Sequence, residues 1–458
     1  MEFMVSNLFP RNVIGDYDIR GKVGIDFSAE HAYQVGLAFG SIVQQQEGKT
    51  VSVGQDRRKT SPMFSSMLIK GLLDSGANVI DLGKTTTPYV SSSYNFIDCD
   101  ASISVTASHN PAHYNGFKFS LFGNSFFGDD LQKMYERIVN KSFRSGSGKL
   151  TKRSFVDNYI NYIKRNFNIS EKSKVIWDCG HGAAGEFIEL AVKDLKGEHK
   201  IIRSEPKDVP DYDNSKISFL EKTKEELDKN PGFIAFTFDG DADRLVIVDE
   251  KKEVWTGDEV LCFLSLVKRI KSGQKISTVW TSKSSKKITD WLKEFEIESF
   301  FSKVGHCYLT NAMNKNLSSI GGEISGHYIF RDNFFTIDDG IFTALRFLDC
   351  MSIFPYKLNQ IKSIFPKVWV SPSLRIKCGT LKKKEIMEYV ENILVISDHS
   401  FELKDDSIIV NHPMGWWLIR PSQTENVVSL RCEGWNENGY MEVKNFMETT
   451  LANIGLII

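Results

Sequence analysis

The sequence predicts an α/β protein of four domains: three related α/β domains with mixed, partly parallel sheets, followed by a smaller C-terminal α+β domain. The chain has 458 residues, and a usual size of roughly 150 residues per domain allows about three to four of them. Strand-like apolar runs alternate with helical runs through most of the length, and this alternation begins again twice. Such a pattern is typical of strands joined by helices around parallel-containing sheets.

The first domain is expected at residues 1–150. The dipeptide Ser61-Pro62 should supply the N-cap and the first-turn proline of its second helix. In this domain we expect strands at 50–54, 78–83 and 101–105 and helices at 29–46, 62–75 and 129–141.

The second and third domains are expected at 151–253 and 254–366. The alternation restarts after the Ser-, Gly- and Lys-rich stretch 142–152 and again after 249–253. In the second domain we expect strands at 174–178, 201–203 and 233–238, a helix at 154–166 and a further helix after the glycine-rich run 180–185. In the third we expect strands at 276–281 and 300–304 and helices at 257–271, 284–294 and 338–351.

The last domain, expected at 367–458, has a different pattern. Pro355 and Pro366 interrupt the chain before it, and strand-like runs then follow one another with few helices between them. This order favours an α+β domain. We expect its strands at 369–378, 407–412, 416–419 and 427–433 and its helices at 382–393 and 440–452.

Composition narrows the class of protein. The hydrophobic fraction of 41% and the charged fraction of 25% are ordinary for a globular protein. A net charge of -1 gives no global field that would recruit nucleic acid or a membrane surface. The seven scattered cysteines include no CxxC pair, which favours reduced thiols. Residues 1–11 lack the long apolar core of a signal peptide, and no run of 18 apolar residues occurs, so we expect a cytoplasmic protein. No obligate protein partner is implied.

The run Thr106-Ala107-Ser108-His109-Asn110-Pro111 is the first candidate for chemistry. It follows an apolar strand and ends in a turn-forming dipeptide, so Ser108 should lie in an exposed turn as a candidate nucleophile. A plain turn serine is the alternative for any isolated serine. A hydrolase is disfavoured, because the flanks are not Gly-x-Ser-x-Gly and His109 is only a sequence neighbour.

The second candidate is Asp239-Gly240-Asp241-Ala242-Asp243-Arg244, which lies between two apolar strands. Three carboxylates at alternate positions are typical of a site for a hard cation. An EF-hand is excluded, because Arg244 stands where its loop needs glycine and the segment 245–248 is strand-like. A solvated acidic turn remains the alternative for this run alone.

Together these two runs resemble the alpha-D-phosphohexomutase superfamily, phosphomannomutase/phosphoglucomutase branch. The hexapeptide around Ser108 matches the family's phosphoserine loop without substitution. Further similar segments follow in family order: Tyr17-Asp18-Ile19-Arg20-Gly21, Asn115-Gly116-Phe117-Lys118, Lys283, Lys303-Val304-Gly305-His306, the sugar-recognition loop Gly322-Glu323-Ile324-Ser325-Gly326-His327 and the phosphate-clamping loop Arg420-Pro421-Ser422-Gln423-Thr424-Glu425. The chain departs from the family at three positions. Arginine is usual where Gln55 stands, glycine or asparagine where Gln423 stands, and proline where Asn426 stands.

The resemblance implies four domains around a central cleft and a reversible phosphoryl transfer between the 1- and 6-positions of a hexose phosphate. Phosphorylated Ser108 would give its phosphoryl group to a hexose monophosphate and form a hexose 1,6-bisphosphate. Mannose is the favoured sugar, with glucose as a second substrate. The catalytic set implied is Ser108, His109, Lys118 and Arg20, and the ligands of one Mg²⁺ per chain are Ser108, Asp239, Asp241 and Asp243. The substrate-binding set implied is Tyr17, Arg20, Lys118, Arg244, Lys283, Lys303, His306, Glu323, Ser325, His327, Arg420, Ser422, Gln423 and Thr424.

Three alternatives stay open. Phosphoglucosamine mutases share the fold, but that branch more often carries glutamine where Ile324 stands. A sugar-phosphate-binding protein without catalysis is a second alternative, which the intact Ser108 and aspartates disfavour. A metal-dependent phosphatase is the third, and it would release phosphate where a mutase retains it.

Overall fold

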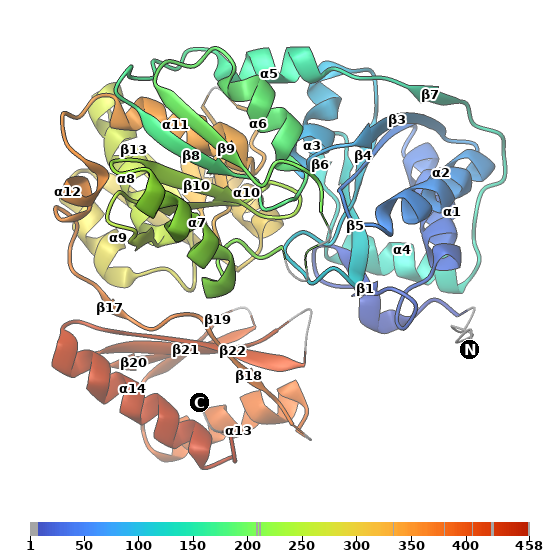
Figure 1. The fold of residues 1–458 in the computed structure, drawn as a ribbon. Helices are drawn as coiled ribbons and strands as arrows, with labels where there is room; N and C mark the ends of the chain where they lie inside the picture. The colour runs from blue at the N-terminus through green and yellow to red at the C-terminus, as the bar shows by residue number, and fades with distance from the viewer. Residues whose placement is uncertain are drawn as a thin grey trace.

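A computed structural model describes residues 8–456, apart from 208, 210, 211, 333, 380, 405 and 423–425. Four β-sheets, each with its own helices, follow one another along the chain (Figure 1). The expected fold class is therefore confirmed: three α/β units are followed by a unit of different architecture. Within these described ranges no helix is both long and apolar enough to span a bilayer.

The first unit is a mixed sheet in the order β1-β5-β4-β2-β3-β7, with β6 paired to β5. Strands β2, β3 and β4 are parallel, whereas β5 runs antiparallel to both β4 and β1. The strands are β1 (Ile19–Lys22), β2 (Thr50–Gln55), β3 (Asn78–Lys84), β4 (Ala101–Val105), β5 (Tyr114–Leu121), β6 (Asn124–Ser125) and β7 (Leu150–Lys152). The helices are the 3₁₀ turn η1 (Arg11–Val13), α1 (Ala29–Gln45), α2 (Ser61–Ser75), α3 (Thr87–Phe96) and α4 (Asp129–Val139).

The start of α2 differs from the expectation. The N-cap is Thr60, and Ser61 is already helical, with Pro62 in the first turn. The Ser61 hydroxyl does not cap the helix, because it donates to Asp56 Oδ1 at 2.5 Å. A buried carboxylate next to the helix therefore displaces the capping bond that the local sequence suggested.

The second and third units also have sheets that contain parallel strands, and these sheets are smaller than the first. The second sheet has the order β12-β11-β10-β8-β9, and the third has the order β14-β13-β15-β16. The second unit contains α5 (Val156–Lys164), β8 (Lys174–Asp178), α6 (Ala184–Val192), β9 (Glu198–Ile202), α7 (Ile217–Lys229), β10 (Ile234–Phe238), β11 (Leu245–Val248) and β12 (Val254–Trp255). The third contains α8 (Gly257–Ser272), β13 (Ile276–Thr281), α9 (Lys286–Lys293), β14 (Ile297–Ser302), α10 (His306–Asn316), β15 (Ile320–Gly322), β16 (Tyr328–Phe330), α11 (Gly340–Met351) and α12 (Leu358–Lys362).

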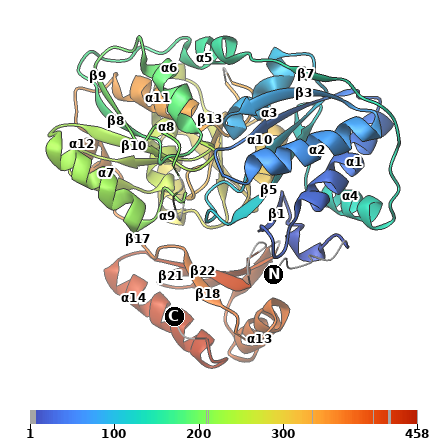
Figure 2. The same ribbon diagram turned by 45° about the vertical axis from the view of Figure 1, so that its right-hand side comes forward.

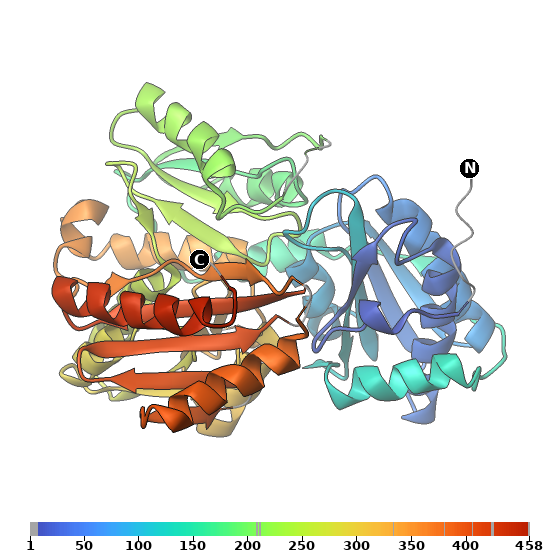
Figure 3. The same cartoon turned by 90° about the horizontal axis from the view of Figure 1, so that it is seen from below.

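The C-terminal unit is an antiparallel sheet covered on one face by two helices. Its strand order is β17-β22-β21-β20-β19, with β18 also paired to β22. Its elements are β17 (Trp369–Val370), β18 (Leu374–Lys377), α13 (Lys383–Ile396), β19 (Phe401–Lys404), β20 (Ser407–His412), β21 (Gly415–Pro421), β22 (Val427–Gly434) and α14 (Glu437–Ala452). Figures 2 and 3 show α13 and α14 on the side of this sheet that faces away from the other units, so its bare face is turned inward.

The hydrophobic cores divide differently from the sheets. One core fills the first unit and another fills the C-terminal unit. A third core runs without a break through the second and third units, where Trp177, Phe236 and Phe347 pack together, and it reaches into the first unit at Tyr89. The second and third units are consequently held to each other by apolar packing, which is the largest stabilising term available to a protein interface.

The loops that follow the parallel strands point toward one another. Loops leave the carboxyl ends of β4, β10, β13, β14 and β15. In α/β sheets this end is where ligands bind, because the loops there are free to vary while the strands fix their positions. Ser108, the three aspartates, Lys283, Lys303, Glu323 and Ser325 lie on these loops, whereas Arg20, Lys118 and Arg420 lie on strands.

Candidate functional site

Ser108 lies in the turn between β4 and β5, but it is not exposed. Only 1% of its surface is accessible, so the expectation of an exposed turn is wrong. The loop of the second unit that carries Asp239 covers Ser108. Because Asp239 is 131 positions away in the sequence, the turn residues around Ser108 could not predict this burial. Ser108 also has a φ of 51°, an unusual conformation for a residue with a side chain.

The acidic run Asp239-Gly240-Asp241-Ala242-Asp243 lies against Ser108. The hydroxyl of Ser108 donates to Asp239 Oδ2 at 2.9 Å and lies 3.3 Å from His109 Nδ1. Close backbone packing brings the two loops this near, because a Cβ at Gly240 would meet the Ser108 carbonyl oxygen at 2.6 Å. The absence of a side chain at position 240 therefore sets the distance between the serine and the carboxylates.

Two basic side chains lie beside the reacting loop. Lys118, on β5, donates to Asp241 Oδ2 at 2.8 Å and also bonds Asp243. Arg20, on the neighbouring strand β1, bonds Asp18 and the side chain of Asn110. The pairing of β1 with β5 and of β5 with β4 brings both cations to the edge of the Ser108 loop.

The carboxylates fit a divalent cation. Asp239, Asp241 and Asp243 each offer one oxygen, and these oxygens lie within 4.8 Å of one another. Buried Oδ1 atoms of Asp241 and Asp243 have no hydrogen-bond partner, which is costly for a carboxylate unless a cation binds it. An all-oxygen donor set of this kind suits Mg²⁺. A second cluster of possible metal ligands, formed by Asp243, His327 and Asp338, shares Asp243 with the first.

The pKa values of these groups are shifted by their environment. Burial, followed by repulsion from Asp243 and Asp241, raises the pKa of Asp239 well above its usual range. For Lys118, burial acts to lower the pKa, but attraction to Asp241 and Asp243 raises it above its ordinary value. The ammonium of Lys118 is therefore a permanent positive charge in the site at neutral pH.

The third unit supplies a polar loop between β15 and β16. The carboxylate of Glu323 accepts from the Gly305 amide at 2.7 Å and from the Ser325 hydroxyl at 2.8 Å. These bonds fix the Glu323 carboxylate at the surface of the cavity described below, with Ser325 as its support.

Two histidines beside this loop share one carboxylate. Asp338 Oδ2 lies 3.0 Å from His306 Nδ1 and 2.7 Å from His327 Nδ1. Arg244 donates through Nε to His327 Nε2 at 3.0 Å. The bond from Arg244 makes Nε2 of His327 the acceptor nitrogen, so the ring proton of the neutral histidine is on Nδ1, the nitrogen close to Asp338.

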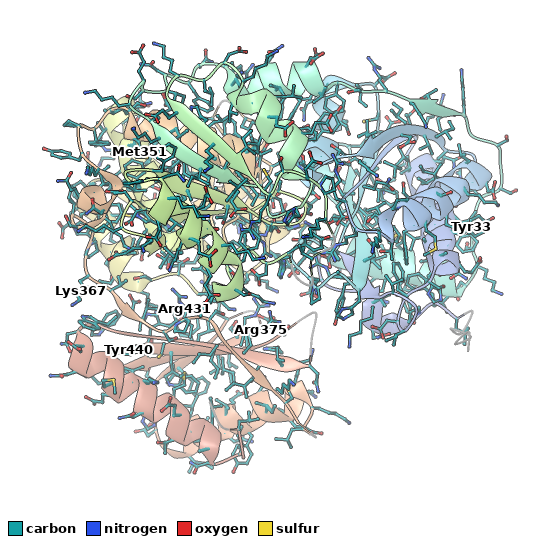
Figure 4. All side chains as sticks on the ribbon, in the orientation of Figure 1. Tyr33, Met351, Lys367, Arg375, Arg431 and Tyr440 are labelled. Carbon is teal, nitrogen blue, oxygen red and sulfur yellow. The ribbon has the colours of Figure 1, made fainter. Side chains whose placement is uncertain are left out.

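The bare face of the C-terminal sheet supplies guanidinium and hydroxyl groups. Figure 4 shows Arg375 and Arg431 on the side of this sheet turned toward the other units. Arg420, on β21, is 8% exposed and lies 3.4 Å from Asp406 Oδ2. Arg375 Nη2 lies 3.5 Å from the Ser422 hydroxyl, so a guanidinium and a hydroxyl group adjoin on this wall.

Lys283, from the loop after β13, faces the same wall. It donates to the hydroxyls of Ser429 at 2.6 Å and Ser373 at 3.1 Å. Burial, followed by repulsion from Arg420 and Arg431, lowers the pKa of Lys283 to about 7. A bound ligand that carries negative charge would relieve this repulsion.

These surfaces enclose one cavity of ≈ 430 Å³. Its cationic side chains outnumber its carboxylates, so the cavity suits an anionic ligand with polar groups along its length. The cations are Arg20, Lys118, Arg244, Lys283, Arg375 and Arg420, and the carboxylates are Asp213 and Glu323. The other lining residues are Tyr17, Ser108, His109, Ser215, Thr281, Val304, Gly305, His306, Ile324, Ser325, His327, Ser373, Ser422 and Ser429.

Comparison with known protein families agrees with this geometry. Models of phosphoglucomutase/phosphomannomutase alpha/beta/alpha domains I, II and III match residues 11–145, 157–253 and 256–368 respectively. The three matches cover more than half of the chain. The chain belongs to the phosphoglucomutase/phosphomannomutase family.

Individual relatives of this family match over nearly the whole chain. A phosphomannomutase/phosphoglucomutase of Pseudomonas syringae pv. tomato is 31% identical over 98% of this chain and 97% of its own. A phosphoglucosamine mutase of Finegoldia magna is 30% identical over 94% of this chain and 96% of its own. The crystal structure of a phosphoglucomutase/phosphomannomutase family protein from Burkholderia thailandensis superposes with a TM-score of 0.87, at 27% identity, over 99% of this chain and all of that one.

The structure brings most of the family residues expected from the sequence to this one cavity. The three aspartates lie directly behind Ser108 and Lys118 rather than on the cavity surface. Lys303 does not line the cavity, and its ammonium lies 5.4 Å from the centre of the Tyr308 ring. Gln423 and Thr424 lie outside the described residues, so their place in the clamp stays a prediction.

Sequence reasoning missed residues that act behind the cavity surface. Thr87 Oγ1 donates to Asp241 Oδ2 at 2.6 Å, and Asp338 holds the two histidines. Arg58 bonds the serine loop itself. The sequence offered one signal, the run Gly54-Gln55-Asp56 before α2, but nothing in it identifies what Arg58 would touch.

Proposed function

We propose that the protein is a phosphohexomutase that interconverts the 1- and 6-phosphates of a hexose, with mannose as the favoured sugar and glucose as a second substrate. One observation carries the proposal: the Ser108 hydroxyl, 2.9 Å from Asp239, opens onto a cavity whose opposite wall carries Arg420, Arg375 and Lys283. A serine and a separate anion-binding wall at two ends of one cavity suit a substrate with a phosphate at one end and a reacting hydroxyl at the other.

The proposed reaction has two transfers. The bond between phosphorus and the Ser108 oxygen breaks as the free sugar hydroxyl forms its own bond to phosphorus, which gives a hexose 1,6-bisphosphate. The sugar then turns end for end, and the other phosphoryl group returns to Ser108. Lys118 and Arg20, both held by carboxylates, would stabilise the charge of the group in transfer. His109, with Nδ1 3.3 Å from the serine oxygen, is the candidate for proton transfer.

The proposed metal site lies at the serine end of the cavity. Asp239, Asp241, Asp243 and Ser108 would hold one Mg²⁺, which when bound withdraws charge from the phosphoryl group. The carboxylates, all nearly inaccessible to solvent, keep water away from the serine, and the four units enclose the intermediate while it turns. The four domains that would surround the substrate are proposed at residues 1–150, 151–253, 254–366 and 367–458.

The test is an assay of purified protein on mannose 1-phosphate, glucose 1-phosphate and glucosamine 1-phosphate, with released phosphate measured in parallel. We expect conversion of the first two to their 6-phosphates without net phosphate release. Net release would instead indicate a phosphatase, and binding without conversion would indicate a protein that has lost catalysis.

Hexose choice is assigned to Glu323 and Ser325. Glucose and mannose differ only at carbon 2, so a loop that accepts both must read the hydroxyls they share, at carbons 3 and 4. Glu323→Ala should therefore reduce kcat/KM for both sugars to a similar degree, and kcat should fall as well because a misplaced ring misaligns the transfer. Ser319→Ala, at the residue before β15, is the control. Loss of activity on only one sugar would mean that the loop reads carbon 2.

A phosphoglucosamine mutase is the second candidate, because the relative from Finegoldia magna carries that name at 30% identity. Ile324 lines the cavity and offers no hydrogen bond to an amino group at carbon 2. Preferential turnover of glucosamine 1-phosphate in the assay above would favour this candidate.

A further inference from the structure

The Arg58 guanidinium grips the backbone of the serine loop from behind. Nη2 donates to the carbonyl oxygens of Ser108 and Asn110, both at 2.7 Å. Nη1 donates to the carbonyl oxygens of Pro111 at 2.7 Å and Tyr114 at 3.2 Å. Three loop carbonyls, including that of the reacting residue, and the carbonyl of the first residue of β5 are therefore satisfied by one side chain.

Asp56 completes this arrangement from the other side. Its carboxylate accepts from Arg58 Nε at 3.0 Å and from Thr106 Oγ1 at 2.8 Å. Thr106 Oγ1 in turn accepts from the Ser108 amide at 2.9 Å. The amide of Ser108 is thus fixed through Asp56 and Thr106, while its carbonyl is fixed by Arg58.

The position of Arg58 excludes a role in binding the sugar phosphate directly. Its side chain is 1% exposed and does not line the 430 Å³ cavity. A buried guanidinium is costly unless its donors are satisfied, and here every hydrogen bond from Nη1 and Nη2 ends on the loop that carries Ser108 or on the first residue of β5. These bonds are also what the left-handed backbone at Ser108 requires, because a strained residue persists only where its surroundings fix it.

We propose that Arg58, with Asp56 and Thr106, is a positioning residue that sets the height and direction of the Ser108 hydroxyl relative to the Asp239 loop. The inference rests on the proposed mutase function, since it assigns Arg58 an effect on phosphoryl transfer. It predicts an effect on the rate of transfer rather than on the binding of sugar phosphate, because the hydrogen bonds of Arg58 end on the serine loop, the first residue of β5 and Asp56, and not on Glu323 or Arg420.

The experiment compares Arg58→Met and Arg58→Lys with Arg57→Met as a matched control. Arg57, the neighbouring residue, pairs with Glu186 at 3.4 Å instead of the loop. We expect kcat of Arg58→Met to fall by about 10²-fold, the scale of a misplacement of about 1 Å at a reacting group. KM should stay within about threefold, and Arg57→Met should match the unchanged protein. Arg58→Lys should recover little, because an ammonium cannot reproduce the two-pronged fork.

Thr106→Val provides an independent route if the Arg58 variants fail to fold. It removes the bond to the Ser108 amide with little change of shape and should lower kcat about tenfold or more, again without a large change in KM. A folded Arg58 or Thr106 variant with unchanged kcat, or with KM raised as much as kcat is lowered, would overturn the inference. If the unchanged protein converts no hexose phosphate, the proposed function fails and the positioning role falls with it. Normal turnover by the unchanged protein and by the Arg58 variants rejects the positioning role alone.

Discussion

The two ends of the cavity are built in different ways. At the serine end, Asp239, Asp241 and Asp243 are all at most 1% exposed, and backbone meets backbone where Gly240 packs on Ser108. At the opposite end, Lys283 and Arg375 contact hydroxyl groups of the C-terminal unit. The first end is tightly packed around buried carboxylates, whereas the second is formed by long basic side chains that contact hydroxyl groups.

The same contrast holds for the contacts between units. The second and third units share one hydrophobic core, but the C-terminal unit has a core of its own. Polar groups join the C-terminal unit to the third: Arg431 lies 3.4 Å from Asp258, and Glu433 accepts from the Lys286 amide at 2.9 Å. Polar interfaces rearrange more readily than apolar ones. We infer that the reacting end is rigid and the phosphate-binding end adapts to the two substrate orientations.

The largest test of this contrast is Ser108→Ala at the rigid end. We expect turnover to fall by about 10³-fold or more, because Ser108 carries the phosphoryl group in both transfers of the proposed reaction. The fold should survive, since the change removes one hydrogen bond worth about 1 kcal/mol. Activity, thermal unfolding and the mass of the phosphorylated peptide measure these effects. Ser102→Ala, on β4 away from the cavity, is the control, and near-normal turnover by Ser108→Ala would remove Ser108 from the mechanism.

Asp241→Asn tests the carboxylates behind the serine. The change keeps shape but removes a ligand charge, so activity should fall about tenfold or more and partly recover at higher Mg²⁺. A chelator should abolish activity in the unchanged protein. Asp249→Asn alters a buried aspartate of the same unit at the far end of β11 and should have no such effect. Full activity in metal-free buffer would contradict the metal assignment.

Arg420→Ala probes the adaptable end and should have a smaller effect. Loss of a charge-assisted hydrogen bond should weaken sugar-phosphate binding by about 1.5–3 kcal/mol, which is about 10- to 150-fold in kcat/KM. Lys377→Ala, an exposed change on β18, is the control. Unchanged KM and turnover for both phosphate isomers would show that the phosphate binds elsewhere.

The smallest expected effect is proton uptake by Lys283. Its pKa is lowered to about 7, so at pH 8 the side chain is mostly neutral in the free protein. A bound phosphate dianion favours the ammonium form, and binding should take up close to one proton per site. Calorimetry at pH 8 in two buffers of different ionisation enthalpy measures this uptake. Lys283→Arg, which is always charged, should bind without uptake, and equal uptake in both proteins would contradict the assignment.

The lowered pKa of Lys283 also determines how its contribution to the free energy of unfolding changes with pH. The unfolded chain holds the proton up to the ordinary lysine value near 10.5, whereas the folded protein releases it near 7. The unfavourable contribution of Lys283 is therefore fully present below pH 7 and disappears as pH rises from about 7 toward 10.5.

The sequence predicts elements well where apolar patterning is local. The strands at Ala101–Val105, Lys174–Asp178, Ile276–Thr281 and Ser407–His412 match their expected bounds. The expected strand at 369–378 is instead two strands, β17 and β18, separated by a segment that contains Pro372. Proline has no amide hydrogen to continue a sheet ladder, so the break has a local cause that the prediction overlooked.

The site is predictable only in part, for a different reason. Ser108, the three aspartates and Glu323 stand in distinctive runs, so their types and spacing suggested chemistry. Burial of Ser108 could not be predicted, because the covering loop is distant in sequence. Arg58 was missed since its partners are backbone carbonyls, and every residue type presents a carbonyl oxygen.

The packing of Gly240 on Ser108 limits which residues position 240 can accept. A methyl group at position 240 would meet the Ser108 carbonyl at 2.6 Å and Tyr212 Cβ at 3.1 Å. A chain with alanine there must separate its first and second units slightly, and the serine would leave its carboxylates. Position 240 therefore constrains a distance between two backbones, although it contributes no side chain to the site.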